Sequence, residues 1–437
     1  MDMIDLTKYD SILDKDYMVR FGYVSQVVGL TIESVGPMCT VGDLCYIVPQ
    51  QEDGEGVYVE VVGFRGKNLL LMPLGETTGI GVGSIVQATG KPLQVGVGDQ
   101  LLGKVVDWQG NPLDKDDKVF CSDYVDIVNQ PPNPLTRQRI TEVMPLGIKA
   151  IDGMLTVGKG QRIGVFAGSG VGKSTLMGMI ARNAHSDINV IALIGERGRE
   201  VREFLEKDLK EEGLKRSIVV VATSDQPALT RIKAAQTATA IAEYFRDQGK
   251  YVLLLMDSLT RFAMAQREVG LAIGEPPVTR GYTPSVFAVM PKLLERAGNS
   301  ENGSITGIYT VLVDGDDMNE PVTDTVRGIL DGHVVLSRKL ANRNHFPAID
   351  VLQSISRVMS DIVTNDHKAA ASEVKKNLAV YQESEDLINI GAYVEGSSSD
   401  IDEAIDKNPK ITEFLRQQVD DKIEFEDVLT LLKDTCN

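Results

Sequence analysis

The sequence predicts an α/β protein in which a mostly parallel sheet is covered by helices on both faces, with a small β-barrel before it and a helical region after it. From about residue 95 to 355, apolar runs of strand length alternate with glycine turns and helical stretches, which is typical of a parallel sheet with helical crossovers. Residues 20–90 carry short β-branched runs between glycine-rich turns, as small barrels do. Residues 360–437 lose the strand pattern and become helical and acidic.

A chain of 437 residues is too long for one compact core, so two or three domains are expected. The changes of pattern put domain boundaries after residues 18, 92 and 359. The barrel strands are expected at Tyr23–Leu30, Val57–Phe64, Leu69–Pro73 and Ile85–Ala88. The central domain is expected to contain a helix over Pro227–Gln248 and strands at Arg162–Ala167, Asn189–Ile194, Ser217–Ala222, Tyr251–Met256 and Ile305–Val313.

The first 18 residues form a segment of their own. Leu6, Tyr9 and Leu13 are spaced i, i+3, i+7, which is the period of one helix face. A short amphipathic helix and a frayed chain end both fit this pattern.

Composition and charge exclude several classes of protein. The net charge of −17 disfavours general binding to nucleic-acid backbone. No apolar run approaches the ~20 residues that span a bilayer, and the first residues lack the positive start of a signal peptide. Cys39, Cys45, Cys121 and Cys436 show no CxxC spacing and no nearby His cluster. They are therefore expected to be buried thiols in a cytosolic protein rather than metal ligands.

The strongest motif is a glycine-rich run between an apolar strand, Ile163–Phe166, and an apolar helix, Leu176–Ala181. Glycines let successive backbone N–H groups turn inward around phosphate oxygens, and the helix N-terminus adds its positive end. A chance glycine turn is the alternative, but it does not require the GKS ending. The residues expected to bind a nucleotide here are Gly168, Ser169, Gly170, Val171, Gly172, Lys173, Ser174 and Thr175, after Ala167 in place of the usual first glycine.

Within this run, Lys173 is expected on the β- and γ-phosphates of ATP and the Ser174 hydroxyl on Mg²⁺. A second Mg²⁺ ligand is expected from Asp257, which ends the wholly apolar run Tyr251–Met256. A carboxylate in this position lies at the carboxyl edge of a parallel sheet, beside the phosphate loop. Such an Asp often caps a helix instead, but here Ser258 and Thr260 are available as caps.

Hydrolysis also needs a base that orients a water molecule. Glu196 directly follows a strand-ending glycine at the same predicted edge and is the candidate, while Arg197 or Arg199 could steady phosphate charge. A surface cluster of ion pairs is the alternative reading of this segment.

At these residues the sequence resembles the protein-export ATPases of bacterial flagella and type III secretion systems, which are more distantly related to the subunits of rotary ATP synthases. The resemblance runs from about residue 20 to the C-terminus, and the flagellar branch is favoured over the injectisome branch. Beyond the phosphate loop it is carried by GERGREVREF (195–204), DSLTRFAMAQRE (257–268), GEPPVTRGYTPSVFAVMPKLLERAG (274–298), ILDGHVVLSR (329–338) and PAIDVLQSISRVM (347–359).

The resemblance implies a RecA-like P-loop core and a homohexameric ring with each ATP at a subunit boundary. It implies that Glu196 is the catalytic carboxylate and that Arg357 is an arginine finger donated to the neighbouring subunit. It further implies that Phe346 stacks on adenine, with Tyr393 as a second aromatic. From the residues alone, Phe346 before a proline would be a core aromatic and Arg357 a surface arginine.

The resemblance also implies partners. Members of this family release chaperone–substrate complexes and feed the substrates into a membrane export gate. Their N-terminal segment binds a stator-like regulator, and their C-terminal helices face a central stalk protein and the gate. The implied location is the cytoplasm, peripheral to the inner face of the cell membrane below the flagellar basal body, without nucleic acid.

Three rival functions remain at this point. A rotary synthase catalytic subunit would need a second, different chain in its ring, whereas Glu196 and Arg357 together would make a ring of identical chains self-sufficient. An RNA-translocating ring is disfavoured by the acidic charge and by the lack of an Arg/aromatic face in residues 20–90. A non-catalytic nucleotide-binding subunit is disfavoured by Glu196.

Overall fold

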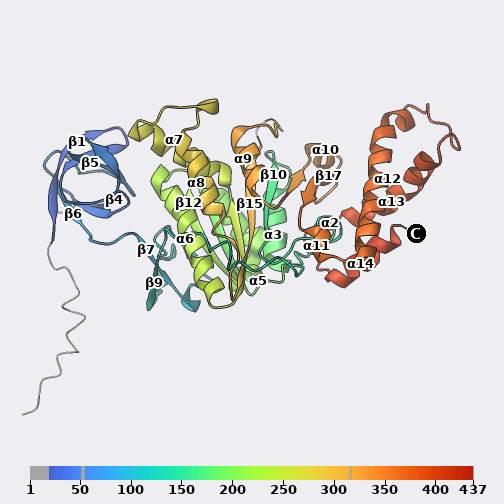
Figure 1. The fold of residues 1–437 in the computed structure, drawn as a ribbon, viewed down its shortest axis with the longest axis horizontal. Helices are drawn as coiled ribbons and strands as arrows, with labels where there is room; N and C mark the ends of the chain where they lie inside the picture. Colours follow the sequence, from blue (N-terminus) through green and yellow to red (C-terminus); the bar gives the residue numbers. More distant parts are fainter. Residues whose placement is uncertain (1–18, 51–54, 314, 316, 437) are drawn as a thin grey trace, which may run out of the picture.

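The computed structural model describes residues 19–50, 55–313, 315 and 317–436. Three regions follow one another along the long axis of the molecule: a β-barrel, a central α/β layer and a group of C-terminal helices (Figure 1). This architecture confirms the predicted fold class. The predicted amphipathic segment with Leu6, Tyr9 and Leu13 lies outside the described residues.

The N-terminal barrel is closed by six strands in the order β1-β2-β5-β4-β3-β6. Its interior is lined by alternate residues such as Val24, Val59 and Leu71, because successive side chains of a strand face opposite sides. The strands are β1 (Phe21–Val28), β2 (Thr31–Val35), β3 (Leu44–Val48), β4 (Val57–Arg65), β5 (Asn68–Pro73) and β6 (Ile85–Ala88).

The central sheet contains every strand that the sequence predicted for it. Its order is β17-β16-β10-β15-β13-β11-β12-β8, with β14 beside β15. All neighbours run parallel except β17 against β16 and β14 against β15. The strands are β8 (Val105–Val106), β10 (Arg162–Ala167), β11 (Ile188–Glu196), β12 (Ser217–Thr223), β13 (Tyr251–Asp257), β14 (Gly298–Asn299), β15 (Ser304–Leu312), β16 (Gly332–Leu336) and β17 (Ile349–Ser356).

Helices cover both faces of this sheet, as the uninterrupted apolar strands predicted. In β13, Leu254 and Met256 pack into one core with α6, α7 and α8, whereas Leu253 and Leu255 pack into a second core with α2 and α3. The helices are α2 (Lys149–Met154), α3 (Lys173–Asn183), α4 (Gly198–Glu203), α5 (Lys210–Lys215), α6 (Ala228–Asp247), α7 (Leu259–Ile273), α8 (Pro284–Leu294), α9 (Pro321–Ile329) and α10 (Arg338–Asn342). One turn of π-helix, η3 (Phe204–Leu209), joins α4 to α5.

The C-terminal region is helical, as predicted. After the short α11 (Met359–Ile362), the long helices α12 (Asn365–Asn389) and α13 (Ser399–Leu415) form a hairpin (Figure 1). The last helix, α14 (Phe425–Asp434), packs its buried Val428 and Leu432 into the same core as α2. No helix within the described ranges is long and apolar enough to cross a membrane.

Two sequence predictions need correction. Residues 93–148 do not follow the strand–helix alternation: β7 (Gln94–Val97) and β9 (Asp123–Asp126) form a separate antiparallel pair, and β8 is a two-residue edge strand. Of the cysteines predicted to be buried, only Cys45 is; Cys39, Cys121 and Cys436 are half-buried. The Cys39 and Cys45 sulfurs lie 3.7 Å apart although their spacing in the sequence is not that of a known motif.

Candidate active site

Several of the predicted site residues lie together at the carboxyl edge of the central sheet because the three parallel strands that carry them end there. The phosphate loop follows β10, Asp257 ends β13 and Glu196 ends β11, and only β15 separates β10 from β13. Leu193 of β11 lies opposite Asp257 in register, so Glu196 extends beyond the point where β13 ends.

The phosphate loop has the backbone that its glycines allow. Gly170 and Gly172 have φ angles of 79° and 90°, a left-handed conformation that other residues adopt only with strain. Gly172 caps α3, so the free N–H groups and positive end of this 11-residue helix face the loop. Ser169 and Ser174 are exposed. The loop can therefore offer N–H groups and hydroxyls to phosphate oxygens.

Lys173 is held between two carboxylates. Its Nζ lies 2.5 Å from Asp257 Oδ1 and 3.7 Å from Glu196 Oε1. Thr310 Oγ1 donates a second hydrogen bond to the same Asp257 oxygen at 2.7 Å. Burial lowers the pKa of Lys173, but the charges of Asp257 and Glu196 outweigh it, so the pKa lies above its ordinary value. The ammonium charge is thus fixed at the mouth of the phosphate loop.

Glu196 has the electrostatics of a general base. Burial, then the negative charge of Asp257, raises the pKa of its carboxyl from 4.5 to about 7, and Lys173 only partly opposes this. The side-chain hydrogen bond between Glu196 and Glu200 and the negative charge of Glu200 also favour the protonated form of Glu196. A carboxylate with a pKa near neutrality accepts a proton from water more readily than an ordinary Glu does.

Helix α3 is braced from behind by the π-turn. Thr175 of α3 donates a hydrogen bond to the carboxylate of Asp208 in η3. Burial raises the pKa of Asp208, and this hydrogen bond partly opposes the rise. A Cβ on Gly178 of α3 would come within 2.6 Å of Asp208, so only glycine permits this close approach. Thr175 therefore bonds to η3, while Ser174 remains exposed.

Phe346 lies beside the phosphate loop. A Cβ placed on Gly172 would stand 3.6 Å from two atoms of the Phe346 ring. Phe346 is 40% exposed, which leaves part of its surface free for a planar group. An aromatic face next to a triphosphate site can stack on a nucleotide base.

The structure does not bring the other three predicted residues to this loop. Arg197 is exposed at the start of α4, and its side chain pairs with Glu200 at 3.6 Å. Tyr393 lies in the turn between α12 and α13, and its hydroxyl donates to Asp402. The adenine contact implied for Tyr393 stays a prediction.

Arg357 lies at the opposite edge of the sheet. It follows β17, which runs antiparallel, so Ile349 pairs with Leu336 near the loop and Ser356 pairs with Gly332 at the other end. Four residues of strand place Arg357 about 13 Å away along the sheet. Its backbone N–H bonds to the Asp331 carbonyl, and its side chain is exposed.

Sequence reasoning missed several neighbours of the site. Thr310 lies two residues before the end of β15, and nothing in the pattern of that strand singles it out. Arg338 donates to the Ser169 carbonyl at 3.1 Å. Arg261 lies against Gly195, so a Cβ there would come within 2.9 Å of its side chain. The position of Arg261 one helical turn after Asp257 was the only available signal.

The residues present fit a magnesium nucleotide. Among the described residues, no three His, Cys, Asp or Glu side chains gather into a ready-made metal site. Magnesium in phosphate-transferring sites usually takes one or two protein oxygens and completes its shell with phosphate and water. The exposed Ser174 hydroxyl and the Asp257 carboxylate supply that small donor set.

Comparison with known proteins assigns each region to a described family. Residues 24–90 match the beta-barrel domain of the ATP synthase alpha/beta family, and residues 147–356 match its nucleotide-binding domain. Residues 363–434 match the C-terminal domain of the type III secretion ATPase EscN.

Full-length relatives agree with these matches. The chain is 60% identical to the flagellum-specific ATP synthase of Bacillus subtilis, over 97% of both chains. It is 52% identical to the type 3 secretion system ATPase of Xanthomonas euvesicatoria, over 94% of this chain and 93% of that protein. The assembled EscN from enteropathogenic E. coli, solved in complex with its central stalk EscO, superposes with a TM-score of 0.88 at 47% identity, covering 95% of this chain and 100% of EscN.

Proposed function

Because the chain belongs to the family of flagellar and type III secretion ATPases, we propose that it hydrolyses ATP in a homohexameric ring to release chaperones and drive the export of flagellar proteins. The observation that carries the proposal is the cluster at the sheet edge, where Lys173 lies within 4 Å of both Asp257 and Glu196. The flagellar branch is favoured by the 60% identity to the Bacillus subtilis flagellar protein, against 52% to the Xanthomonas secretion ATPase.

We assign the roles at this edge as follows. The loop from Gly168 to Thr175 binds the phosphates through its N–H groups, and Lys173 adds a fixed positive charge. Glu196 accepts a proton from the attacking water. Phe346 contacts the base of ATP.

Ser174 and Asp257 would hold Mg²⁺, which when bound supplies positive charge to the β- and γ-phosphates. Asp257 now pairs with Lys173. When phosphate oxygens arrive, the lysine can turn to them and leave the carboxylate to the cation. Thr310 keeps its hydrogen bond to Asp257 and holds that side chain in place.

The position of Arg357 supports the proposed ring. Its side chain is exposed at the edge of the sheet opposite the phosphate loop, so it does not serve the site of its own chain. An arginine there can reach a γ-phosphate only in a neighbouring subunit. In a ring of identical chains each boundary would combine one phosphate loop with one Arg357.

The partners are proposed from the relatives. EscN is solved with a central stalk, so we propose a stalk protein that contacts the C-terminal helices of this chain. A stator-like regulator at residues 1–18, an export-gate membrane protein and chaperone–substrate complexes complete the set, with the ring at the inner face of the cell membrane. We place the domain boundaries after residues 18, 92 and 359, close to the ends of the matched regions.

The function is tested by complementation. The chain is expressed in a Bacillus subtilis strain that lacks its flagellum-specific ATP synthase, and swimming and filament length are measured. We expect the wild-type chain to restore filaments and Glu196→Gln to leave the cells bald. If instead it restores effector secretion in a strain lacking a secretion ATPase and never restores filaments, the injectisome branch is correct.

A further inference from the structure

The aromatic ring beside the phosphate loop is attached to the C-terminal domain. The Phe346 carbonyl accepts a hydrogen bond from the backbone N–H of Gln417 at 3.0 Å. Gln417 lies two residues after the end of α13 and is only 6% exposed. A residue 71 positions away in the sequence therefore fixes the backbone that carries the ring.

The side chain of Gln417 fastens this segment to the central domain. Its Oε1 accepts from the N–H of Lys149 at 2.8 Å, and its Nε2 donates to the carbonyls of Gly147 at 2.9 Å and Asp421 at 3.3 Å. One acceptor and two donors of the amide are thus used. Gly147 in turn packs on Asn183 at the end of α3, the helix that begins at the phosphate loop.

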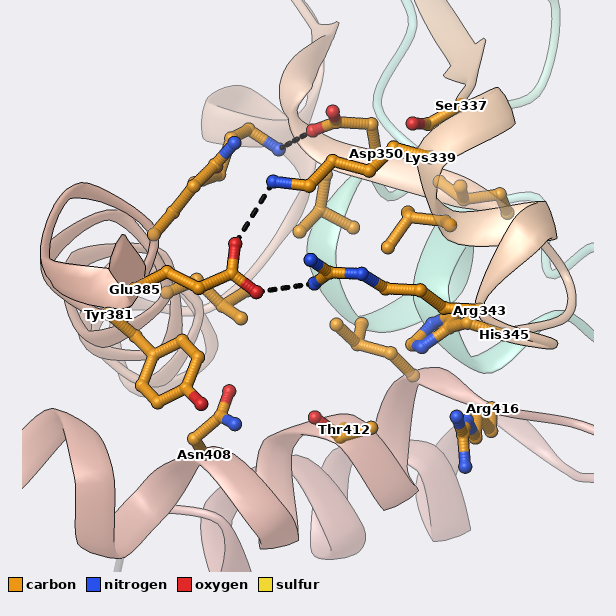
Figure 2. A pocket seen from close by; sticks show the side chains of 17 residues that line it. Ser337, Lys339, Arg343, His345, Asp350, Tyr381, Glu385, Asn408, Thr412 and Arg416 are labelled. Carbon is orange, nitrogen blue, oxygen red and sulfur yellow. Dashed lines mark hydrogen bonds and ion pairs between the residues drawn. The ribbon is translucent and has the colours of Figure 1, made fainter. Parts of the chain in front are cut away.

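Beside this anchor the two domains are separated by a cavity of about 240 Å³ (Figure 2). Figure 2 shows Glu385 of α12 reaching across it to Lys339 and Arg343, at 3.0 and 2.5 Å. His345, next to Phe346, lines the cavity, and its Nε2 has no hydrogen-bond partner among the described residues. The chain next to Phe346 thus borders a hollow between the two domains.

We propose that Gln417 is a positioning residue: its amide sets the distance between Phe346 and the phosphate loop and so determines how well the base of ATP is held. The proposal rests on the base contact assigned to Phe346 above. Without the amide, the half-buried Lys149 N–H and the buried Gly147 carbonyl lose their partners. The segment after α13 then moves, and the Phe346 carbonyl moves with it. Movement of the C-terminal helices can therefore change the affinity for ATP through Gln417 and Phe346.

The test is Gln417→Met, which keeps the volume of the side chain and removes its hydrogen bonds. We expect KM for ATP to rise about tenfold, a change comparable in size to the net contribution of a single hydrogen bond, while kcat stays unchanged. Inhibition by inorganic tripolyphosphate, which has no base, should stay at the wild-type concentration. Gln417→Glu keeps the acceptor for the Lys149 N–H, so its KM for ATP should lie between the values of the wild type and Gln417→Met.

The matched control is Glu385→Ala, which removes two ion pairs across the same cavity without touching Phe346. Its KM should equal that of the wild type. If Glu385→Ala raises KM as much as Gln417→Met does, or if tripolyphosphate binding weakens in parallel, general loosening between the domains explains the effect and the proposal is wrong.

A double mutant separates this proposal from the function it rests on. Phe346→Ala should raise KM, and adding Gln417→Met should raise it no further, because both changes act on one contact. If Phe346→Ala leaves KM unchanged, the base contact itself is wrong. If Phe346→Ala raises KM and Gln417→Met does not, the base contact holds and only the positioning role fails.

Discussion

At the scale of single residues, the site is governed by one buried ammonium between two carboxylates. Lys173 pairs with Asp257 and lies near Glu196, so removing its charge leaves two neighbouring negative groups in a buried setting. The phosphates of ATP would then meet carboxylates without a compensating cation. The lysine therefore matters for binding as well as for charge balance in the free protein.

We expect Lys173→Ala to weaken ATP binding by about a hundredfold or more, since a charge-assisted contact to phosphate is lost and repulsion is added. Isothermal titration with Mg-ATP measures this. Lys215→Ala is the control, because Lys215 is 74% exposed on α5, where it pairs with Glu211. Equal affinities of the two variants would remove Lys173 from the phosphate site.

Glu196→Gln is expected to bind Mg-ATP normally and to lose about 10²–10⁴ in kcat, the usual effect of removing one positioned base. Steady-state turnover together with nucleotide titration measures both properties. Glu200→Gln serves as a comparison, because Glu200 hydrogen-bonds to Glu196 without lying at the end of the strand. If Glu200→Gln is the slower variant, the base has been assigned to the wrong carboxyl.

The pH profile follows from the same carboxyl. The base acts only when deprotonated, and burial with Asp257 raises the pKa of Glu196 to about 7. We therefore expect kcat/KM to fall below a pH of about 7 and to level off above it, whereas an unshifted Glu would keep it flat down to about 4.5. The residual kcat/KM of Glu196→Gln should not fall in this way below a pH of about 7. If kcat/KM of the wild-type protein falls only near a pH of about 4.5, the raised pKa of Glu196 is wrong.

The sequence could place Lys173, Asp257 and Glu196 together because a rule connects them: carboxyl ends of neighbouring parallel strands share one edge. No comparable rule reaches Phe346 or Gln417. The contact of Phe346 with Gly172 joins parts of the chain 174 residues apart, and the Gln417 bonds join two domains. Local patterns do not encode such contacts, so only family resemblance pointed to Phe346 and nothing pointed to Gln417.

At the scale of elements, buried parallel strands were predictable because both of their faces are apolar. Barrel strands are harder to predict from the sequence. β2 carries Glu33, which is buried and paired with Arg65 of β4, and such a polar residue interrupts the expected alternation. β3 is only five residues long. β1 ends at Val28 rather than at Leu30, because Gly29 with φ 57° begins the turn.

A buried ion pair joins Glu243 of helix α6 to Arg296, which follows helix α8. Arg296 and Glu243 are each only 4% exposed, and Arg296 also donates to the Ile127 carbonyl at 2.8 Å. We expect Arg296→Met to lower the free energy of unfolding by about 3–5 kcal/mol, because Glu243 is left charged and buried without its partner. Chemical denaturation followed by circular dichroism measures the loss.

Two further variants make this test specific. Pairing Arg296→Met with Glu243→Leu should recover much of the stability, since no unpaired charge then remains in the core. Arg202→Ala breaks a surface ion pair in which the Arg202 side chain is 80% exposed and the Glu206 side chain 57%. This change should affect stability little. If the double variant is as unstable as Arg296→Met alone, the packing around Arg296 matters more than its charge.

At the scale of the whole molecule, one chain carries the phosphate loop and Arg357 at opposite ends of the strands of one sheet. The phosphate loop lies at the carboxyl edge, and Arg357 lies where β17 ends beside Asp331. The antiparallel direction of β17 creates this separation. Hydrolysis by the proposed ring should therefore need two subunits, and specific activity should rise with protein concentration until rings form.

We expect Arg357→Ala to bind ATP and assemble but to lose roughly 10³–10⁵ in turnover, the usual range for an arginine that stabilises transition-state charge. Mixing shows whether it acts between subunits. Lys173→Ala chains have a dead loop but still offer Arg357, and Arg357→Ala chains have an intact loop but no arginine to lend. A mixture of equal amounts should regain partial activity at boundaries where an intact loop meets an intact arginine.

The mixture is informative only if the subunits exchange, which fluorescence transfer between labelled chains can establish. A control mixture of Lys173→Ala with Glu196→Gln should stay dead, because both changes lie on the loop side of the boundary and no boundary combines two intact halves. If exchange is confirmed and the mixture with Arg357→Ala also stays dead, then Arg357 does not complete a neighbour's site, and the geometry that separates it from its own loop leaves it a structural role only.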